Sequence, residues 1–168
     1  MTRSRTELDL RDMTDLSDAE VTALTHLEVT HEQEGFGGSF AESVEIWRAG
    51  PGDKVLGFAF YLDGAPVGMT LFKRPPLSPD WVAADAASLH GLKIALPWQG
   101  QGLGHAAFRL TVDAARRHWP GLRRLMLAVD APNAPALAVY RRYGMTQMGS
   151  VCAGRQGPEY RLNLSFPP

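Results

Sequence analysis

Residues 99–104 read Gln-Gly-Gln-Gly-Leu-Gly, and they separate a strand-like segment from a helix-like one. Glycines let a backbone approach a ligand closely, and the first N–H groups of a helix have no partners inside that helix. The helix dipole adds a preference for negative charge at the same end. The pattern therefore predicts an anion site that suits a diphosphate, with a tight glycine-rich turn as the alternative interpretation.

The segments on both sides of this loop predict an alternation of strands and helices. Residues 87–96 predict a strand that ends at Pro97, and the apolar spacing from Leu103 predicts a helix that ends near residues 119–121. Further along we expect a strand over 122–129, a helix over 133–143, and strands over 145–151 and 159–166.

The first half of the chain predicts two helices and a hairpin. Ser17 and Glu20 have the spacing of a capping box and start a helix, whose pattern glycines 35, 37 and 38 interrupt. A short helix is expected over 39–48. Strand-like residues over 54–62 and 67–72, joined by Asp63-Gly64, predict an antiparallel hairpin. The fold class expected is α/β: a mixed, mostly antiparallel central sheet flanked by helices, in a single domain over 1–168.

Composition and charge exclude several functional classes. The chain has 168 residues, 45% of them hydrophobic, and a formal net charge of −1, so we expect no nucleic-acid partner. No apolar run approaches the roughly 20 residues that span a bilayer, and the N-terminus does not resemble a signal peptide. The only cysteine, Cys152, excludes an intrachain disulfide, so a reducing, cytoplasmic location is expected. We expect no metal site.

Two other phosphate-binding motifs compete for the glycine loop. A Walker loop is excluded because no Gly-Lys-Ser/Thr follows. A dinucleotide fingerprint fits loosely through Gly102, Gly104 and Ala107, with Asp130 as the ribose-binding acid. However, Asp130 lies further from the loop than the usual ~20 residues, and only 38 residues follow it, too few for a second βαβ half.

Two motifs in succession carry a family resemblance that covers roughly residues 88–145. The run Gln99-x-x-Gly102-x-Gly104 resembles the Gln/Arg-x-x-Gly-x-Gly/Ala signature of GCN5-related N-acetyltransferases (GNAT). About thirty residues later, Asn133, Ala136, Tyr140 and Gly144-Met145 resemble the second motif of that family, with Met145 in place of the commoner Phe and with Leu137 and Val139 sharing the role of one leucine. The resemblance implies a GNAT-like fold and acetyl-CoA-dependent transfer of an acetyl group to a primary amine, by direct attack of the amine on the thioester.

The resemblance also implies roles for particular residues. Backbone N–H groups of the loop would bind the pyrophosphate of coenzyme A, and the preceding strand would pair with its amide-bearing arm. The cofactor-binding residues expected on this basis are Leu92, Ile94, Ala95, Leu96, Gln99, Gly100, Gln101, Gly102, Leu103, Gly104, Asn133 and Tyr140.

Catalytic roles fall on Ser88, His90 and Tyr140. Ser88 and His90 lie eleven and nine residues before the motif glutamine, where the family often has its base or water relay. His90 can serve because imidazole titrates near neutrality, and strand alternation puts Ser88, His90, Leu92 and Ile94 on one face. Tyr140 is the expected general acid for the leaving thiolate. The alternatives are a structural histidine, a core tyrosine and, for Asn133, a helix N-cap.

The acyl acceptor is expected to be a small-molecule or peptide amine. The acidic residues Glu28, Glu32 and Glu34 lie where the family often builds its acceptor pocket, although a solvated helix face is the alternative. Arg116, Arg117, Arg123 and Arg124 are interpreted as a solvated basic edge, with a contact to the cofactor's ribose phosphate as the alternative.

Three questions stay open at this level. The sequence leaves the length of the acyl chain and the formation of a homodimer undecided. A non-catalytic, coenzyme-A-binding sensor or structural module and a dinucleotide-binding oxidoreductase are the competing functions.

Overall fold

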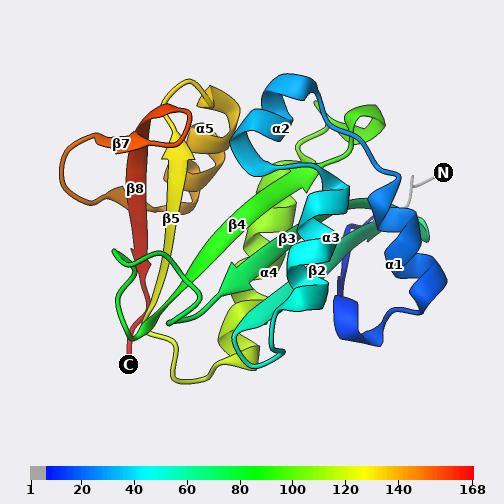
Figure 1. Ribbon diagram of the computed structural model, residues 1–168, viewed down its shortest axis with the longest axis horizontal. Coiled ribbons are helices and arrows are strands. Elements are labelled where there is room, and N and C mark those ends of the chain that lie inside the picture. Colours follow the sequence, from blue (N-terminus) through cyan, green and yellow to red (C-terminus); the bar gives the residue numbers. More distant parts are fainter. Residues whose placement is uncertain (1–6) are drawn as a thin grey trace, which may run out of the picture.

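The fold is built on one mixed sheet, shown in Figure 1, in a computed structural model that describes residues 7–168. The strand order is β1-β2-β3-β4-β5-β8-β6, and β7 also pairs with β8. Only β4 and β5 pair in parallel; the other pairs are antiparallel, which confirms the expected fold class. The strands are β1 (Asp9–Asp12), β2 (Val55–Leu62), β3 (Ala65–Lys73), β4 (Ala86–Ile94), β5 (Arg124–Asp130), β6 (Thr146–Gln147), β7 (Cys152–Gly154) and β8 (Gly157–Ser165).

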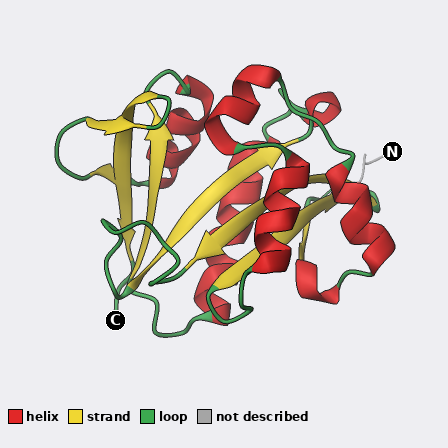
Figure 2. Ribbon diagram, in the orientation of Figure 1, coloured by secondary structure: helices red, strands yellow, loops and turns green. Residues whose placement is uncertain are grey.

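Helices cover both faces of this sheet, as Figure 2 shows. They are α1 (Asp18–Thr25), α2 (His31–Gly37), α3 (Phe40–Ala49), α4 (Leu103–His118) and α5 (Ala134–Tyr143), with short 3-10 turns at Met13–Asp15 and Leu96–Trp98. On one face, Phe40 and Val44 of α3 pack against Met69 and Leu71 of β3. On the other face, Phe108 of α4 joins a cluster that contains side chains from β2, β4, β5 and α5. Every residue of β2 is buried, so the sheet is covered on both sides at its centre.

The predicted hairpin is confirmed. Asp63 and Gly64 both have positive φ, at 50° and 79°, and Leu62 pairs directly with Ala65. Two consecutive residues of positive φ form the two-residue turn whose twist matches that of the flanking strands.

Four local predictions are wrong or incomplete. Glycines 35 and 37 do not interrupt helical structure but lie inside α2, which starts with its own capping box of Thr30 and Gln33. The strand expected over 145–151 is reduced to Thr146–Gln147. The short strands β1 and β7 were not expected at all.

Two irregularities of β4 decide the geometry of the neighbouring cleft. Between the pairs Leu71–His90 and Met69–Lys93, β3 has one residue and β4 has two, so β4 bulges where Gly91 has a φ of 58°. The bulge reverses the alternation beyond it. Ser88, His90 and Lys93 therefore share the face of Met69 and Leu71, which α3 covers, whereas Leu92 and Ile94 pack on the side of α4. The expectation that all four residues from Ser88 to Ile94 share one face is wrong.

The second irregularity is the divergence of β4 from β5. The two strands pair only over Ala86–Ser88 and Arg124–Met126. Beyond this point they separate, as Figure 1 shows, and α5 and α2 both lie at the upper end of the widening gap in this view.

Candidate active site

A large cleft follows the gap between the diverging strands. Its volume is about 1230 Å³, and side chains from α2, α3, β4, β5, α5 and the glycine loop line it. Eleven of the residues expected from the sequence line this cleft: Ser88, His90, Leu92, Ile94, Gln99, Gly100, Gly102, Leu103, Gly104, Asn133 and Tyr140. Ala95, Leu96 and Gln101 do not.

The glycine loop ends in a helix start that no side chain caps. Gly100 and Gly102 both have a φ of 77°, a conformation that other residues adopt only with strain, and Gly102 is the N-cap of α4. The other four α-helices in residues 7–168 each have a side chain that accepts a hydrogen bond at the N-cap. The first N–H groups of α4 are therefore available to an external acceptor.

Space is available in front of these groups. A Cβ atom built on Gly100 or Gly102 would meet no atom within 4 Å, and one built on Gly104 would meet only a methyl group of Val139 at 3.9 Å. An open cradle of N–H donors at the positive end of a 16-residue helix fits a diphosphate.

The side chain of Gln99 forms hydrogen bonds with other residues of the protein. Its side-chain amide donates to the carbonyl of Ile94 at 2.8 Å and to Oε1 of Gln33 at 3.0 Å, while Gln33 donates back to Gln99 at 3.1 Å. The side chain thus connects the glycine loop to β4 and α2. It shapes the loop and has little capacity left to bind a ligand itself.

The backbone N–H groups of Ala95 and Leu96, just before the glycine loop, also form hydrogen bonds within the chain. The N–H of Ala95 donates to the backbone carbonyl of Val67 at 2.8 Å, and that of Leu96 donates to the backbone carbonyl of Glu28 at 2.9 Å. The free edge lies instead on β4 between Ser88 and Ile94, on the side from which β5 diverges.

Ser88 and His90 form a close pair at the narrow end of the gap. The Oγ atom of Ser88 lies 2.6 Å from Nε2 of His90, and it also lies 3.4 Å from the carbonyl oxygen of Lys73. Burial, with the nearby positive charge of Lys73, lowers the pKa of His90 to about 4. The imidazole is therefore neutral at pH 7, and the expectation that it titrates near neutrality is wrong.

Tyr140 lines the cleft and is largely buried. The residue is 6% exposed, and its ring packs edge-on against Phe108 at 5.1 Å between centroids. Burial alone raises the pKa of the phenol, so it stays protonated throughout the physiological range. The core interpretation of Tyr140 fits this packing, and the residue also lines the cleft, while its expected role as a general acid stays a prediction.

Asn133 caps α5, as one of its two interpretations expected. Its side-chain oxygen accepts from the N–H of Ala136 at 3.5 Å, and Pro135 stands in the first turn. Asn133 also lines the cleft.

Five acidic residues line the cleft. Glu34, Glu42 and Glu45 belong to α2 and α3, and Asp130 and Glu159 belong to β5 and β8. Of the three acidic residues expected here, only Glu34 lines the cleft. Glu28 follows the end of α1 and so does not share a helix with Glu32.

Lys93 is the cleft residue that sequence reasoning missed. It is 8% exposed, and its ammonium group donates to the carbonyls of Gly37 at 3.1 Å and Ser39 at 3.3 Å and to the hydroxyl of Ser43 at 2.5 Å. Regular alternation would have pointed this side chain toward α4. The lone glycine at position 91 was the available signal, because an isolated glycine inside a strand often marks a bulge.

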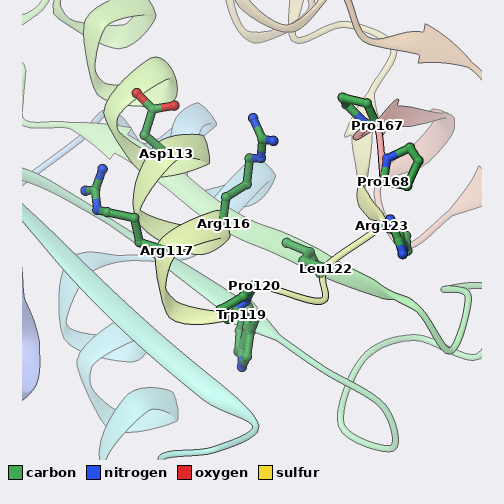
Figure 3. Close-up of a pocket in the computed structure, with 9 residues that line it drawn as sticks. All are labelled: Asp113, Arg116, Arg117, Trp119, Pro120, Leu122, Arg123, Pro167 and Pro168. Carbon is green, nitrogen blue, oxygen red and sulfur yellow. The ribbon is translucent and has the colours of Figure 1, made fainter.

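A second hollow of about 430 Å³ lies at the opposite end of α4, and Figure 3 shows Arg116, Arg117 and Arg123 among the residues that line it. A helix of 16 residues is about 24 Å long, so these arginines are remote from the glycine loop. This separation argues against the alternative of a contact with the cofactor's ribose phosphate. In residues 7–168, no helix is both long and apolar enough to cross a bilayer.

Comparisons with known proteins point to one family. The model of the Acetyltransferase (GNAT) family matches residues 21–145. A putative [ribosomal protein bS18]-alanine N-acetyltransferase from Bacillus subtilis (strain 168) is 33% identical over 69 residues, which are 41% of this chain. The match spans 44% of that relative's length.

Solved structures share the fold at low sequence identity. An aminoglycoside acetyltransferase, AAC(6')-Ib, in complex with coenzyme A has a TM-score of 0.72 at 16% identity, with 95% of each chain covered. Spermidine N-acetyltransferase from Vibrio cholerae, in complex with coenzyme A and spermine, also has a TM-score of 0.72, at 18% identity and 95% coverage of each chain. The family model covers most of the chain and includes both the glycine loop and the Asn133–Tyr140 segment, so the chain belongs to the GNAT family of acetyltransferases.

Proposed function

We propose that this chain is an acetyl-CoA-dependent N-acetyltransferase that transfers an acetyl group to a primary amine. The observation that carries the proposal is the uncapped start of α4, where two glycines of positive φ leave an open cradle at the mouth of the β4–β5 gap. The dinucleotide-binding alternative is set aside, because the sheet is mostly antiparallel and the family is established.

Different groups of the chain would bind different parts of coenzyme A. The N–H groups at the start of α4 would hold the diphosphate of coenzyme A, and the free edge of β4 would pair with its amide-bearing arm. Gln99 would act indirectly by fixing the loop through Ile94 and Gln33. When bound, acetyl-CoA supplies the acyl group already activated as a thioester.

The amine must lose a proton before it can act as a nucleophile. An alkylamine of pKa 10.4 is neutral at pH 7 about once in 2,500 molecules, a penalty of roughly 4.6 kcal/mol. With a pKa of about 4, His90 is too weak a base to keep that proton. We therefore assign Ser88 and His90 a relay role: they orient a water molecule, or the amine itself, and pass the proton toward solvent.

Tyr140 is assigned to the leaving sulfur. Its raised pKa keeps the phenol protonated, so the hydroxyl can donate a hydrogen bond to a thiolate at any physiological pH. The same raised pKa opposes complete proton transfer, so hydrogen bonding is the main contribution.

The acceptor is proposed to be a cationic amine, either small or at the end of a peptide. Glu34, Glu42 and Glu45, which line the cleft, would attract it before it loses its proton. The names of the similar proteins include both small amines and a protein acceptor: an aminoglycoside, spermidine and a ribosomal-protein alanine.

Two measurements test this proposal. Calorimetry should detect acetyl-CoA binding, and a thiol-release assay against a panel of polyamines, aminoglycosides, amino acids and peptides should find at least one accepted amine. Binding without release for any amine would favour a non-catalytic coenzyme-A-binding module, which the weak basicity of His90 keeps as the second candidate. Absence of binding would reject both.

A further inference from the structure

Helix α2 forms part of the cleft wall without any buried side chain of its own. It has seven residues, and two of them are glycines. A helix this short is not stable alone in water, and apolar burial usually supplies the missing stability. Other contacts must therefore hold α2 in place.

Two polar attachments hold it, one at each end. At the start of the helix, Gln33 exchanges two hydrogen bonds with Gln99 of the glycine loop. At its end, Lys93 of β4 donates to the carbonyl of Gly37 and to Ser39 and Ser43 of the following helix. Figure 1 shows α2 leading into α3 near the upper end of β4.

The ammonium group of Lys93 is fitted to this junction. An ammonium has three N–H donors, and three acceptors surround it. The charge also lies at the C-terminal, negative end of α2, and the carboxylates of Glu34 and Glu42 favour its protonated form. Burial opposes that charge and lowers the pKa of Lys93 to about 8.

A buried charge of this kind adds little net stability compared with an apolar residue of the same size. What it does provide is a fixed geometry between β4, the end of α2 and the start of α3. The segments in question carry Glu34, Glu42 and Ser43 into the cleft.

We propose that Lys93 is a positioning residue for the acyl acceptor. Its three hydrogen bonds fix the α2–α3 wall against β4, so that the amine enters at a defined place beside Ser88 and His90. The inference rests on the proposed acetyltransferase function for its kinetic consequence, but the attachment of the wall can be measured without any activity.

The experiment compares Lys93→Met with wild type and with Lys54→Met, a control at a half-exposed lysine outside the cleft. Hydrogen exchange is expected to speed up at least tenfold in residues 31–40 of Lys93→Met and to stay unchanged in α4. The KM for an accepted amine should rise about tenfold or more, with kcat within about threefold and coenzyme A affinity within about twofold of wild type. Lys54→Met should match wild type in hydrogen exchange, KM, kcat and affinity for coenzyme A.

Ser43→Ala removes one of the three acceptors and provides a milder second test if Lys93→Met does not fold. It should show the same pattern, with about a threefold change in exchange and KM. Unchanged exchange in residues 31–40, or a loss of kcat with an unchanged KM, would overturn the proposal. If wild type transfers no acyl group at all, the proposed function fails by itself, while the exchange rates still decide whether Lys93 holds the wall.

Discussion

Replacing Gly104 with glutamate should stabilise the fold and, at the same time, weaken cofactor binding about tenfold or more. Gly104 lies in the first turn of α4 with helical backbone, and a Cβ atom there would meet only Val139, at 3.9 Å. Nothing inside residues 7–168 therefore requires a glycine at this position. A bulky or charged side chain here would instead act on a molecule that approaches the helix start.

The gain in stability follows from two terms. Glutamate has a helix propensity better than that of glycine by about 0.5 kcal/mol, and a negative charge in the first turn adds about 0.3–1 kcal/mol through the helix dipole. Thermal unfolding should therefore shift upward by roughly 2–5 °C for a chain of this size.

The loss of binding follows from the same geometry. Every Cβ in a helix tilts toward the N-terminus, so the new carboxylate would point at the uncapped N–H groups. At about 6 Å from a doubly charged diphosphate, the repulsion amounts to roughly 1.5–5 kcal/mol, which weakens binding about tenfold or more. Calorimetry with coenzyme A measures this effect directly.

Gly104→Ala is the matched control, since the family signature allows alanine here. It should raise the unfolding free energy by about 0.8 kcal/mol and leave the affinity for coenzyme A within about threefold. If Gly104→Glu bound coenzyme A as tightly as wild type, the assignment of the diphosphate to this helix would be refuted. If Gly104→Ala destabilised the protein, the argument that nothing in the fold requires glycine would be refuted.

Three further predictions concern Tyr140, His90 and Asn133. Tyr140→Phe should lower kcat at least tenfold with little change in the affinity for coenzyme A, and the opposite split in steady-state kinetics would make Tyr140 a packing residue only. His90 has a folded pKa of about 4 against 6.5 when unfolded, so its contribution to stability is complete above pH 6.5 and is lost as pH falls toward 4. Denaturant unfolding should thus show wild type losing about 2 kcal/mol more than His90→Gln between pH 7 and pH 4.5; equal losses would mean that His90 is not held neutral. Asn133→Ala removes the N-cap of α5 and should cost about 1 kcal/mol of unfolding free energy, whereas an unchanged melting temperature would show that the 3.5 Å contact contributes nothing.

Local sequence signals predicted most of the sheet and the helix that carries the loop. Asp63-Gly64 specified its hairpin because a two-residue turn of positive φ needs those residue types, and α4 followed from an apolar stripe with a glycine start. The motif residues from Gln99 to Gly104 and at Tyr140 were found because their spacing is a property of the sequence alone.

The missed features depend on contacts between distant segments. The face of Lys93 is set by the bulge at Gly91, and its partners Gly37, Ser39 and Ser43 lie at least 50 residues away along the chain. Helix α2 has no apolar stripe from which the sequence could predict it, because polar contacts rather than apolar burial hold it in place. The low pKa of His90 likewise arises from burial and from Lys73, which alternation within one strand does not reveal.

The central claim is that main-chain N–H groups at the start of α4 hold the diphosphate of coenzyme A. An amide NMR titration of the ¹⁵N-labelled protein with coenzyme A tests it most directly. We predict saturable shifts that are largest for residues 101–105, with smaller ones along the free edge of β4. Saturable binding that leaves those amides unmoved, or no binding at millimolar coenzyme A, would contradict the claim.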